Sequence, residues 1–140
     1  MNKLSFSIEN VELSDGYEKF VAECFFYLVD GKKLEYQGYN PLSYWEVIED
    51  SLQDDHFDNK EMVLISCCTC GYWECDCVVA VVTEKPSSVM WQIHKRWHDE
   101  ILATYEFDKG NYISVMEQMK KAADERVESG ASWKKEEIEK

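Results

Sequence analysis

The fold class follows from Phe20-Val21-Ala22-Glu23-Cys24-Phe25-Phe26-Tyr27-Leu28-Val29 and from the Asp30-Gly31 dipeptide that comes next. Aromatic and β-branched side chains occupy both alternating sets of positions in this run, which is typical of a strand buried on both faces. Asp-Gly readily adopts the positive φ angles of a two-residue hairpin turn. After the turn, Leu34 and Tyr36 alternate with polar residues, and we expect them to face Tyr27 and Phe25 across the hairpin.

Further strands are indicated on either side of this hairpin. Alternating or continuous apolar runs occur at Leu4 to Ile8, Met62 to Ile65, Val78 to Val82, Val89 to Ile93, and Tyr105 to Phe107. Their short length and β-branched composition favour strands over helices. We therefore predict a mainly antiparallel sheet of about six strands.

Two helices are predicted. The first is short and spans about 43–52, where Ser43 and Glu46 form a capping-box pattern. The second spans about 109–128, with Asp108 as its N-cap and Gly130 as its stop. Its apolar residues recur every three or four positions, as expected for a helix that packs on a sheet. The prediction is one α+β domain over 1–129, followed by a charged, frayed tail over 130–140.

Length and charge exclude several classes of protein. A chain of 140 residues supports one domain. Fifteen basic and 28 acidic residues give a net charge of −13, which argues against nucleic acid or an anionic membrane surface as partner. No apolar run approaches the roughly 20 residues of a membrane helix. Residues 1–7 lack the apolar core of a signal peptide, so we expect a cytoplasmic protein.

Five of the six cysteines fall in one short segment, Cys67-Cys68-Thr69-Cys70-Gly71-Tyr72-Trp73-Glu74-Cys75-Asp76-Cys77. Because side chains alternate along a strand, a hairpin could gather two Cys-x-Cys pairs on one face. The predicted ligand set is Cys68, Cys70, Cys75 and Cys77. Four thiolates suffice for a structural zinc ion, although Cys-x-x-Cys is the commoner spacing.

Other interpretations of the cysteines stay open. Cys-x-Cys pairs also suit Cu(I), and reduced cysteines are common as small buried residues. A thiol redox pair is a further alternative, disfavoured because Glu74 and Asp76 should raise neighbouring thiol pKa values by like-charge repulsion. His98 is a weaker candidate ligand: it could join His94 on one face of a helix, but the alternation before it favours a strand. Cys24 is expected to be a core residue.

A second cluster is acidic. Between residues 46 and 61, seven carboxylates and one lysine give a charge of −7 + 1 = −6. Such a patch could dock a basic protein, since complementary potentials speed association and set specificity. Tyr72 and Trp73 would add exposed aromatic side chains at the hairpin tip, as interface centres favour. The predicted partner-binding residues are Glu46, Glu49, Asp50, Asp54, Asp55, Asp58, Glu61, Tyr72 and Trp73.

No motif predicts a catalytic residue. The sequence has no glycine-rich phosphate loop, no Gly-x-Ser-x-Gly elbow and no His-Glu-x-x-His helix. A Cys–His pair such as Cys70 with His98 would rest on residue type alone. No cofactor is expected other than a zinc ion in the cysteine segment.

Three motifs resemble a widespread group of small, uncharacterised bacterial proteins. They are the strand that enters Cys68-Thr69-Cys70-Gly71-Tyr72-Trp73-Glu74-Cys75, the Val89-Met90-Trp91 segment, and the helix start Phe107-Asp108-Lys109-Gly110-Asn111-Tyr112. The resemblance covers about residues 60–120. It implies a shared α+β fold and brings no activity with it. Cys67 and Cys77 are extra relative to the group, so a site built on them need not be general to it.

Charge, size and the missing catalytic motifs together favour a non-enzymatic binding protein. We expect it to hold a basic protein partner through its acidic patch and aromatic residues, as an inhibitor or immunity-type protein does. The alternative is a domain that binds zinc or another metal through the Cys67–Cys77 segment, and the minor alternative is a thiol redox protein.

Overall fold

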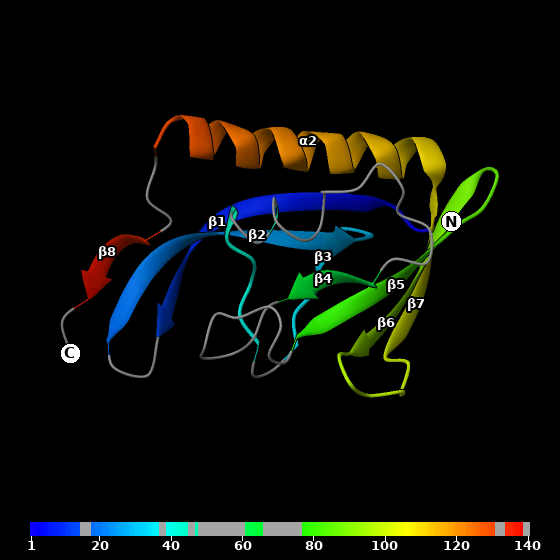
Figure 1. The fold of residues 1–140 in the computed structure, drawn as a ribbon, viewed down its shortest axis with the longest axis horizontal. Helices are drawn as coiled ribbons and strands as arrows, with labels where there is room; N and C mark the ends of the chain where they lie inside the picture. The colour runs from blue at the N-terminus through cyan, green and yellow to red at the C-terminus, as the bar shows by residue number, and fades with distance from the viewer. Residues whose placement is uncertain are drawn as a thin grey trace.

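The computed structural model describes residues 1–14, 18–36, 39–44, 47, 61–65, 77–130 and 134–138. Within these ranges the chain forms two antiparallel sheets and a long C-terminal helix (Figure 1). The elements are β1 (Leu4–Ser14), β2 (Lys19–Val29), β3 (Lys32–Lys33), β4 (Glu61–Ile65), β5 (Val78–Glu84), β6 (Ser88–Lys95), β7 (Ala103–Asp108), α2 (Lys109–Glu128) and β8 (Lys134–Ile138).

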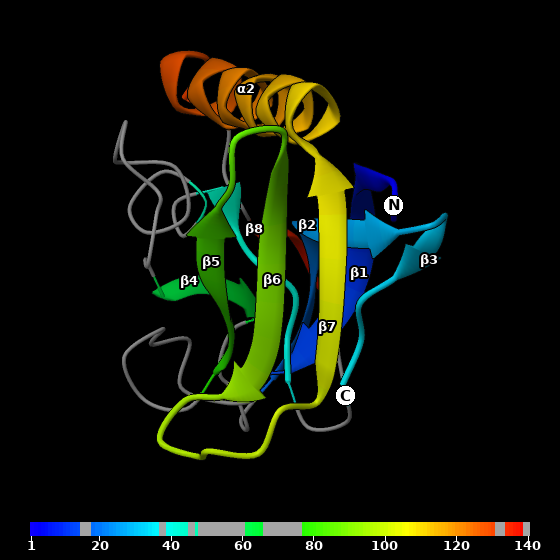
Figure 2. The ribbon, with the colours of Figure 1, turned by 90° about the vertical axis from the view of Figure 1, so that its right-hand side faces the viewer.

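The α+β class is confirmed, but the single six-stranded sheet is wrong. The first sheet contains β1, β2, β3 and β8, and the second follows the order β4-β5-β6-β7. Figure 2 shows the strands of the second sheet crossing those of the first, with α2 over both. The sequence-based prediction missed this division because local alternation identifies strands but does not show which distant strands pair.

The hairpin predicted at Asp30-Gly31 is confirmed. Both residues have positive φ, 52° at Asp30 and 81° at Gly31, and the Leu34 amide donates to the Tyr27 carbonyl over 2.9 Å. The partner of Phe25 differs from the prediction. Strand β3 ends at Lys33, and Phe25 exchanges two backbone hydrogen bonds with Leu42 instead of facing Tyr36.

Three separate segments therefore line the same edge of β2. They are β3 at its C-terminal end, Leu42 in the middle, and β8 opposite Lys19–Ala22. Strand β8 lies beyond Gly130, where the sequence predicts a charged tail. An edge strand needs only its backbone N–H and C=O groups for pairing, so a charged composition is compatible with this position.

Strand β2 is apolar on both faces because each face contributes to a different buried cluster. Phe25, Tyr27 and Val29 belong to the main core. Phe20 and Cys24, on the other face, belong to a smaller cluster with Leu13. The Cys24 thiol is fully buried, as predicted, and donates to the Ala22 carbonyl over 3.7 Å.

The C-terminal helix begins and ends where the sequence predicts. The Asp108 carboxylate accepts a hydrogen bond from the Asn111 amide over 3.1 Å, which is an N-cap. At the other end, Gly130 has a φ of 70° and its amide donates to the Val127 carbonyl. The buried stripe of the helix comprises Tyr112, Val115, Met119 and Ala123. Of the other predicted helix, near 43–52, only Ser43, Tyr44 and Val47 are described; the remainder lies outside the described residues.

Trp91 is the centre of the main core. It lies in β6, is fully buried, and makes edge-to-face contacts with Tyr27 of β2, Phe107 of β7 and Tyr112 of α2, at ring-centroid distances of 5.4, 4.9 and 5.9 Å. Its indole N–H donates to the Tyr112 hydroxyl over 3.2 Å. Burial raises the pKa of Tyr112 to about 12, although the hydrogen bond from Trp91 opposes the shift. One side chain thus joins both sheets and the helix.

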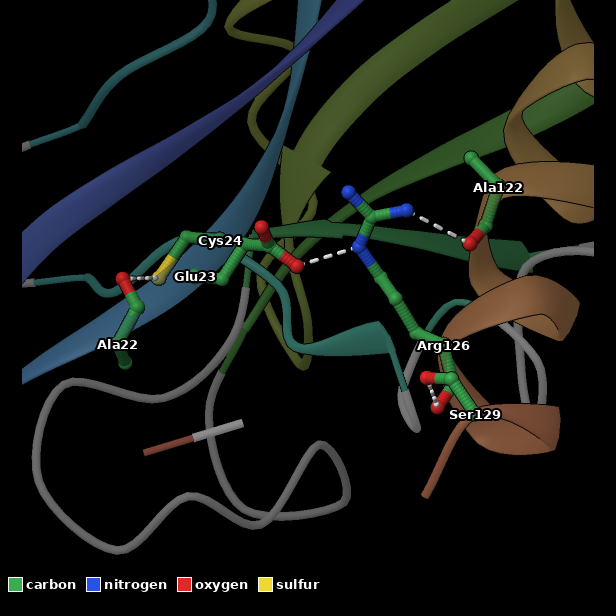
Figure 3. Close-up of polar contacts among 6 residues, drawn as sticks. All are labelled: Ala22, Glu23, Cys24, Ala122, Arg126 and Ser129. Carbon is green, nitrogen blue, oxygen red and sulfur yellow. Dashed lines mark hydrogen bonds and ion pairs between the residues drawn. The ribbon is translucent and has the colours of Figure 1, made fainter. Parts of the chain in front are cut away.

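A half-buried ion pair fastens the end of α2 to the first sheet (Figure 3). The Arg126 guanidinium donates through Nε to Glu23 of β2 and through Nη1 to the Ala122 carbonyl. It also lies 5.5 Å from the ring centroid of Phe25. Figure 3 shows Glu23 and Cys24 pointing to opposite sides of β2, so the acidic neighbour faces the helix while the thiol faces away from it.

The N-terminus ties the two sheets together at a second point. The Asn2 amide donates to the Glu106 carbonyl of β7 over 2.7 Å. Its side chain and the Lys3 amide both donate to the Asp30 carboxylate, each over 2.8 Å. These two hydrogen bonds lower the pKa of Asp30, with the Asn2 side chain as the larger cause. Residues 2 and 3 thus connect β7 to the β2–β3 turn.

Candidate functional site

Two connections start from the same end of the second sheet. The first is the cysteine segment between Ile65 of β4 and Val78 of β5, which are register partners in an antiparallel pair. The second is the loop Arg96–Leu102 between β6 and β7, hereafter the β6–β7 loop, visible at the lower end of Figure 2. The Arg96 amide donates to the Cys77 carbonyl over 2.8 Å, so the two connections are adjacent at their bases.

The flanking strands of the cysteine segment confirm a hairpin, but most of the predicted ligands lie outside the described residues. Cys77 alone is described, and it is fully buried directly before β5. Cys68, Cys70 and Cys75 fall within 66–76, which is not described. Across the described ranges no group of three His, Cys, Asp or Glu residues could hold a metal ion. The zinc site stays a prediction.

Of the residues in the predicted acidic patch, the structure describes only Glu61. Its carboxylate accepts a hydrogen bond from Nε of Arg96 over 3.0 Å, and the Arg96 side chain is buried. This carboxylate is therefore already neutralised by a cation of the same chain. The other predicted partner-binding residues lie outside the described ranges: Glu46, Glu49, Asp50, Asp54, Asp55, Asp58, Tyr72 and Trp73.

The two histidines are placed as the strand interpretation predicts. His94 lies in β6 and His98 lies in the turn after it, so no helix face joins them. Nδ1 of His94 lies 2.9 Å from both the Lys95 and the His98 carbonyl oxygens. Because carbonyls only accept hydrogen bonds, this nitrogen carries a proton and donates to both. His94 therefore braces the turn, while the side chain of His98 is exposed.

Sequence reasoning missed the β6–β7 loop itself. Trp97 is 80% exposed and Ile101 is 47% exposed, which makes two large apolar side chains on one short loop. Asp99 and Glu100 lie between them in the sequence and are exposed as well. The signal was a tryptophan among polar residues between two strands, a place where turn residues such as glycine or asparagine are usual.

No family model, no curated protein and no solved structure matches the chain. No helix in the described part of the chain is long and apolar enough to cross a membrane. The class is thus defined by the structure alone, as an α+β protein of two antiparallel sheets joined by a C-terminal helix.

Proposed function

We propose that this protein is a non-enzymatic binding protein for a basic protein partner, in the manner of an inhibitor or immunity protein. The observation that carries the proposal is the net charge of −13, of which −6 falls within residues 46–61. A surface with a large excess of one charge attracts a partner of the opposite charge and accelerates their encounter. Within the described surface, Asp99 and Glu100 add two exposed carboxylates that form no ion pair with another described residue.

The acidic patch is tested by reversing its central charges. We expect Asp54→Lys, Asp55→Lys and Asp58→Lys together to weaken binding of the purified partner at least tenfold at low salt, because three attractive charges become repulsive. The partner would first be retained from lysate at low ionic strength, and its Kd would then be measured by calorimetry over a series of salt concentrations.

The matched control reverses three exposed carboxylates on α2, namely Glu117→Lys, Glu125→Lys and Glu128→Lys. This variant has the same net charge as the first but leaves residues 46–61 intact. Equal weakening by both variants would show that only net charge matters, and the patch would lose its role. Salt-independent binding by the wild type would remove the electrostatic proposal as a whole.

The alternative function is a zinc-binding domain with Cys68, Cys70, Cys75 and Cys77 as ligands. The β4–β5 pairing supports it, because antiparallel strands bring the two ends of the cysteine segment together. We expect native mass spectrometry of protein purified without chelator to show the mass excess of one zinc ion, lost on acid denaturation. A chelator should also lower Tm, since a ligand bound only to the folded state stabilises it.

Two serine substitutions separate zinc binding from simple packing. Cys75→Ser should abolish the mass excess. Cys24→Ser should retain it, because a serine hydroxyl can donate to the Ala22 carbonyl in place of the thiol. A bare mass with six free thiols in the wild type would leave the cysteines as packing residues.

A further inference from the structure

The β6–β7 loop holds its tryptophan in an unfavourable backbone conformation. The His98 amide donates to the Lys95 carbonyl over 3.0 Å, which closes a four-residue turn with Trp97 at its third position. Trp97 has a φ of 71°. Turns with positive φ at this position favour glycine or asparagine, and a bulky side chain there is an outlier.

Burial of the tryptophan does not explain this conformation. Trp97 is 80% exposed, whereas Trp91, only six residues earlier, is fully buried at the centre of the core. Large exposed aromatic side chains in locally strained positions are a feature of binding sites, where the strain fixes the side chain toward a ligand.

The turn is anchored on the side of β5. The backbone amide of Arg96 donates to the Cys77 carbonyl, and Nε of its side chain donates to the Glu61 carboxylate over 3.0 Å. The Arg96 side chain is buried, so the residue directly before Trp97 is fixed at both its backbone and its side chain.

The turn is also anchored on the side of β7. The Leu102 amide donates to the Ile93 carbonyl over 2.7 Å, which closes the far end of the loop. His94 donates to the carbonyls of Lys95 and His98, as described above. A loop fixed in this way loses little conformational entropy when a partner binds, so more of the contact energy appears as affinity.

The chemistry of the loop selects a partner that is both basic and apolar. The exposed carboxylates of Asp99 and Glu100 lie between Trp97 and Ile101 in the sequence. They form no hydrogen bond or ion pair with another residue in the described ranges. The nearby Lys95 ammonium is directed at the Tyr39 ring, 5.7 Å from its centroid. An arginine can stack on an indole face and pair with a carboxylate at the same time, and an aliphatic side chain can cover Ile101.

We propose that the β6–β7 loop is a docking site for a segment of a basic protein that presents arginine beside aliphatic side chains. Trp97 is the apolar anchor, and Asp99 and Glu100 provide the charged flank. The proposal rests on the proposed function in that the partner is a basic protein, and it adds where and by which chemistry that partner is held.

The test uses a synthetic hexapeptide of alternating arginine and leucine as the probe. The isotope-labelled full chain is titrated with it at up to millimolar concentration, and the indole and backbone N–H signals are followed by NMR. We expect the Trp97 indole signal and the amides of residues 97–101 to shift most. Trp97→Gly should weaken binding at least tenfold, and Asp99→Asn with Glu100→Gln should weaken it and flatten its salt dependence.

Two controls keep a folding defect apart from a binding defect. Trp97→Gly should leave Tm unchanged or raise it, since glycine adopts a φ of 71° without steric cost. Ile113→Ala removes another exposed apolar side chain, on α2, and should bind the peptide as the wild type does.

The outcomes distinguish this proposal from the proposed function. If the peptide binds equally to wild type and Trp97→Gly but weakly to the Asp54, Asp55 and Asp58 reversal, the loop proposal is overturned and the acidic patch retains its role. Loss of binding in Trp97→Gly alone supports the loop. If the peptide does not bind to the wild type at all, the loop proposal is overturned. The proposed function is then tested separately, by the salt dependence of the Kd for the purified partner.

Discussion

Replacing Trp91 with alanine should lower the free energy of unfolding by about 3–5 kcal/mol, the usual range for deleting a fully buried large aromatic side chain. The substitution removes ring contacts to Tyr27, Phe107 and Tyr112 together, and it leaves the Tyr112 hydroxyl without its donor. Since small domains are stable by about 5–15 kcal/mol, the loss should be a large fraction of the total free energy of unfolding. Urea denaturation followed by far-ultraviolet circular dichroism measures the loss.

Trp97→Ala is the matched control, because it makes the same chemical change at a tryptophan that is 80% exposed. Its effect should stay within about 0.5 kcal/mol, as for most surface substitutions. Trp91→Phe should fall between the two, since it keeps an aromatic ring and loses the N–H donor. Similar losses for Trp91→Ala and Trp97→Ala would show that Trp91 does not join the sheets and the helix as described.

Replacing Arg126 with methionine should cost about 2–3 kcal/mol. The change leaves the Glu23 carboxylate, only 21% exposed, without its cation, and it removes the hydrogen bond to Ala122. A hydrogen bond to a charged group contributes about 1.5–3 kcal/mol, and an uncompensated half-buried charge adds to the loss. Chemical denaturation of Arg126→Met, Glu23→Leu and the double variant would measure the coupling in a double-mutant cycle.

The double variant should recover much of the stability, because an apolar pair can replace a buried ion pair at little cost. The comparison pair is Lys19 with Glu12, on the same sheet, where both side chains are more than half exposed and the closest atoms are 3.7 Å apart. Lys19→Met should cost less than about 1 kcal/mol, as expected of surface ion pairs. Equal losses at the two pairs would mean that Arg126 does not fasten α2 to the sheet.

Local sequence patterns predicted most strands and the C-terminal helix of this fold, because turns and helix starts are specified by residues that are close together in the sequence. Asp30-Gly31 specifies a turn through its tolerance of positive φ, and Asp108 specifies a helix start through its side-chain oxygen. The division into two sheets depends on contacts between distant strands, which alternation does not encode. Strand β8 pairs through its backbone, and residues 134–138 contain no apolar repeat that would predict a strand.

The candidate site was predicted in part for the same reason. The cysteine hairpin was visible because its flanking strands are apolar and its cysteines are clustered, and the described strands confirm the pairing around it. The conformation of the β6–β7 loop could not be predicted, because the backbone hydrogen bonds that hold it, from Arg96 to Cys77 and from Leu102 to Ile93, are contacts that no local pattern encodes. A sequence pattern shows a turn most clearly when glycine or asparagine occupies the strained position, and here tryptophan occupies it.

The position of β8 has a consequence for biosynthesis. Residues 19–22 of β2 are paired on one edge by Lys134–Ile138, a strand that begins 134 − 22 = 112 residues further along the chain. At about 5–20 residues per second, a ribosome needs roughly 6–22 s to synthesise that interval. During this time the edge of β2 at Lys19–Ala22 lacks its native strand, while β1, its neighbour on the other edge, has already been made. The nascent chain therefore presents an open strand edge, with Phe20, Val21 and Ala22 along it, to chaperones and to neighbouring nascent chains until residues 134–138 have been synthesised.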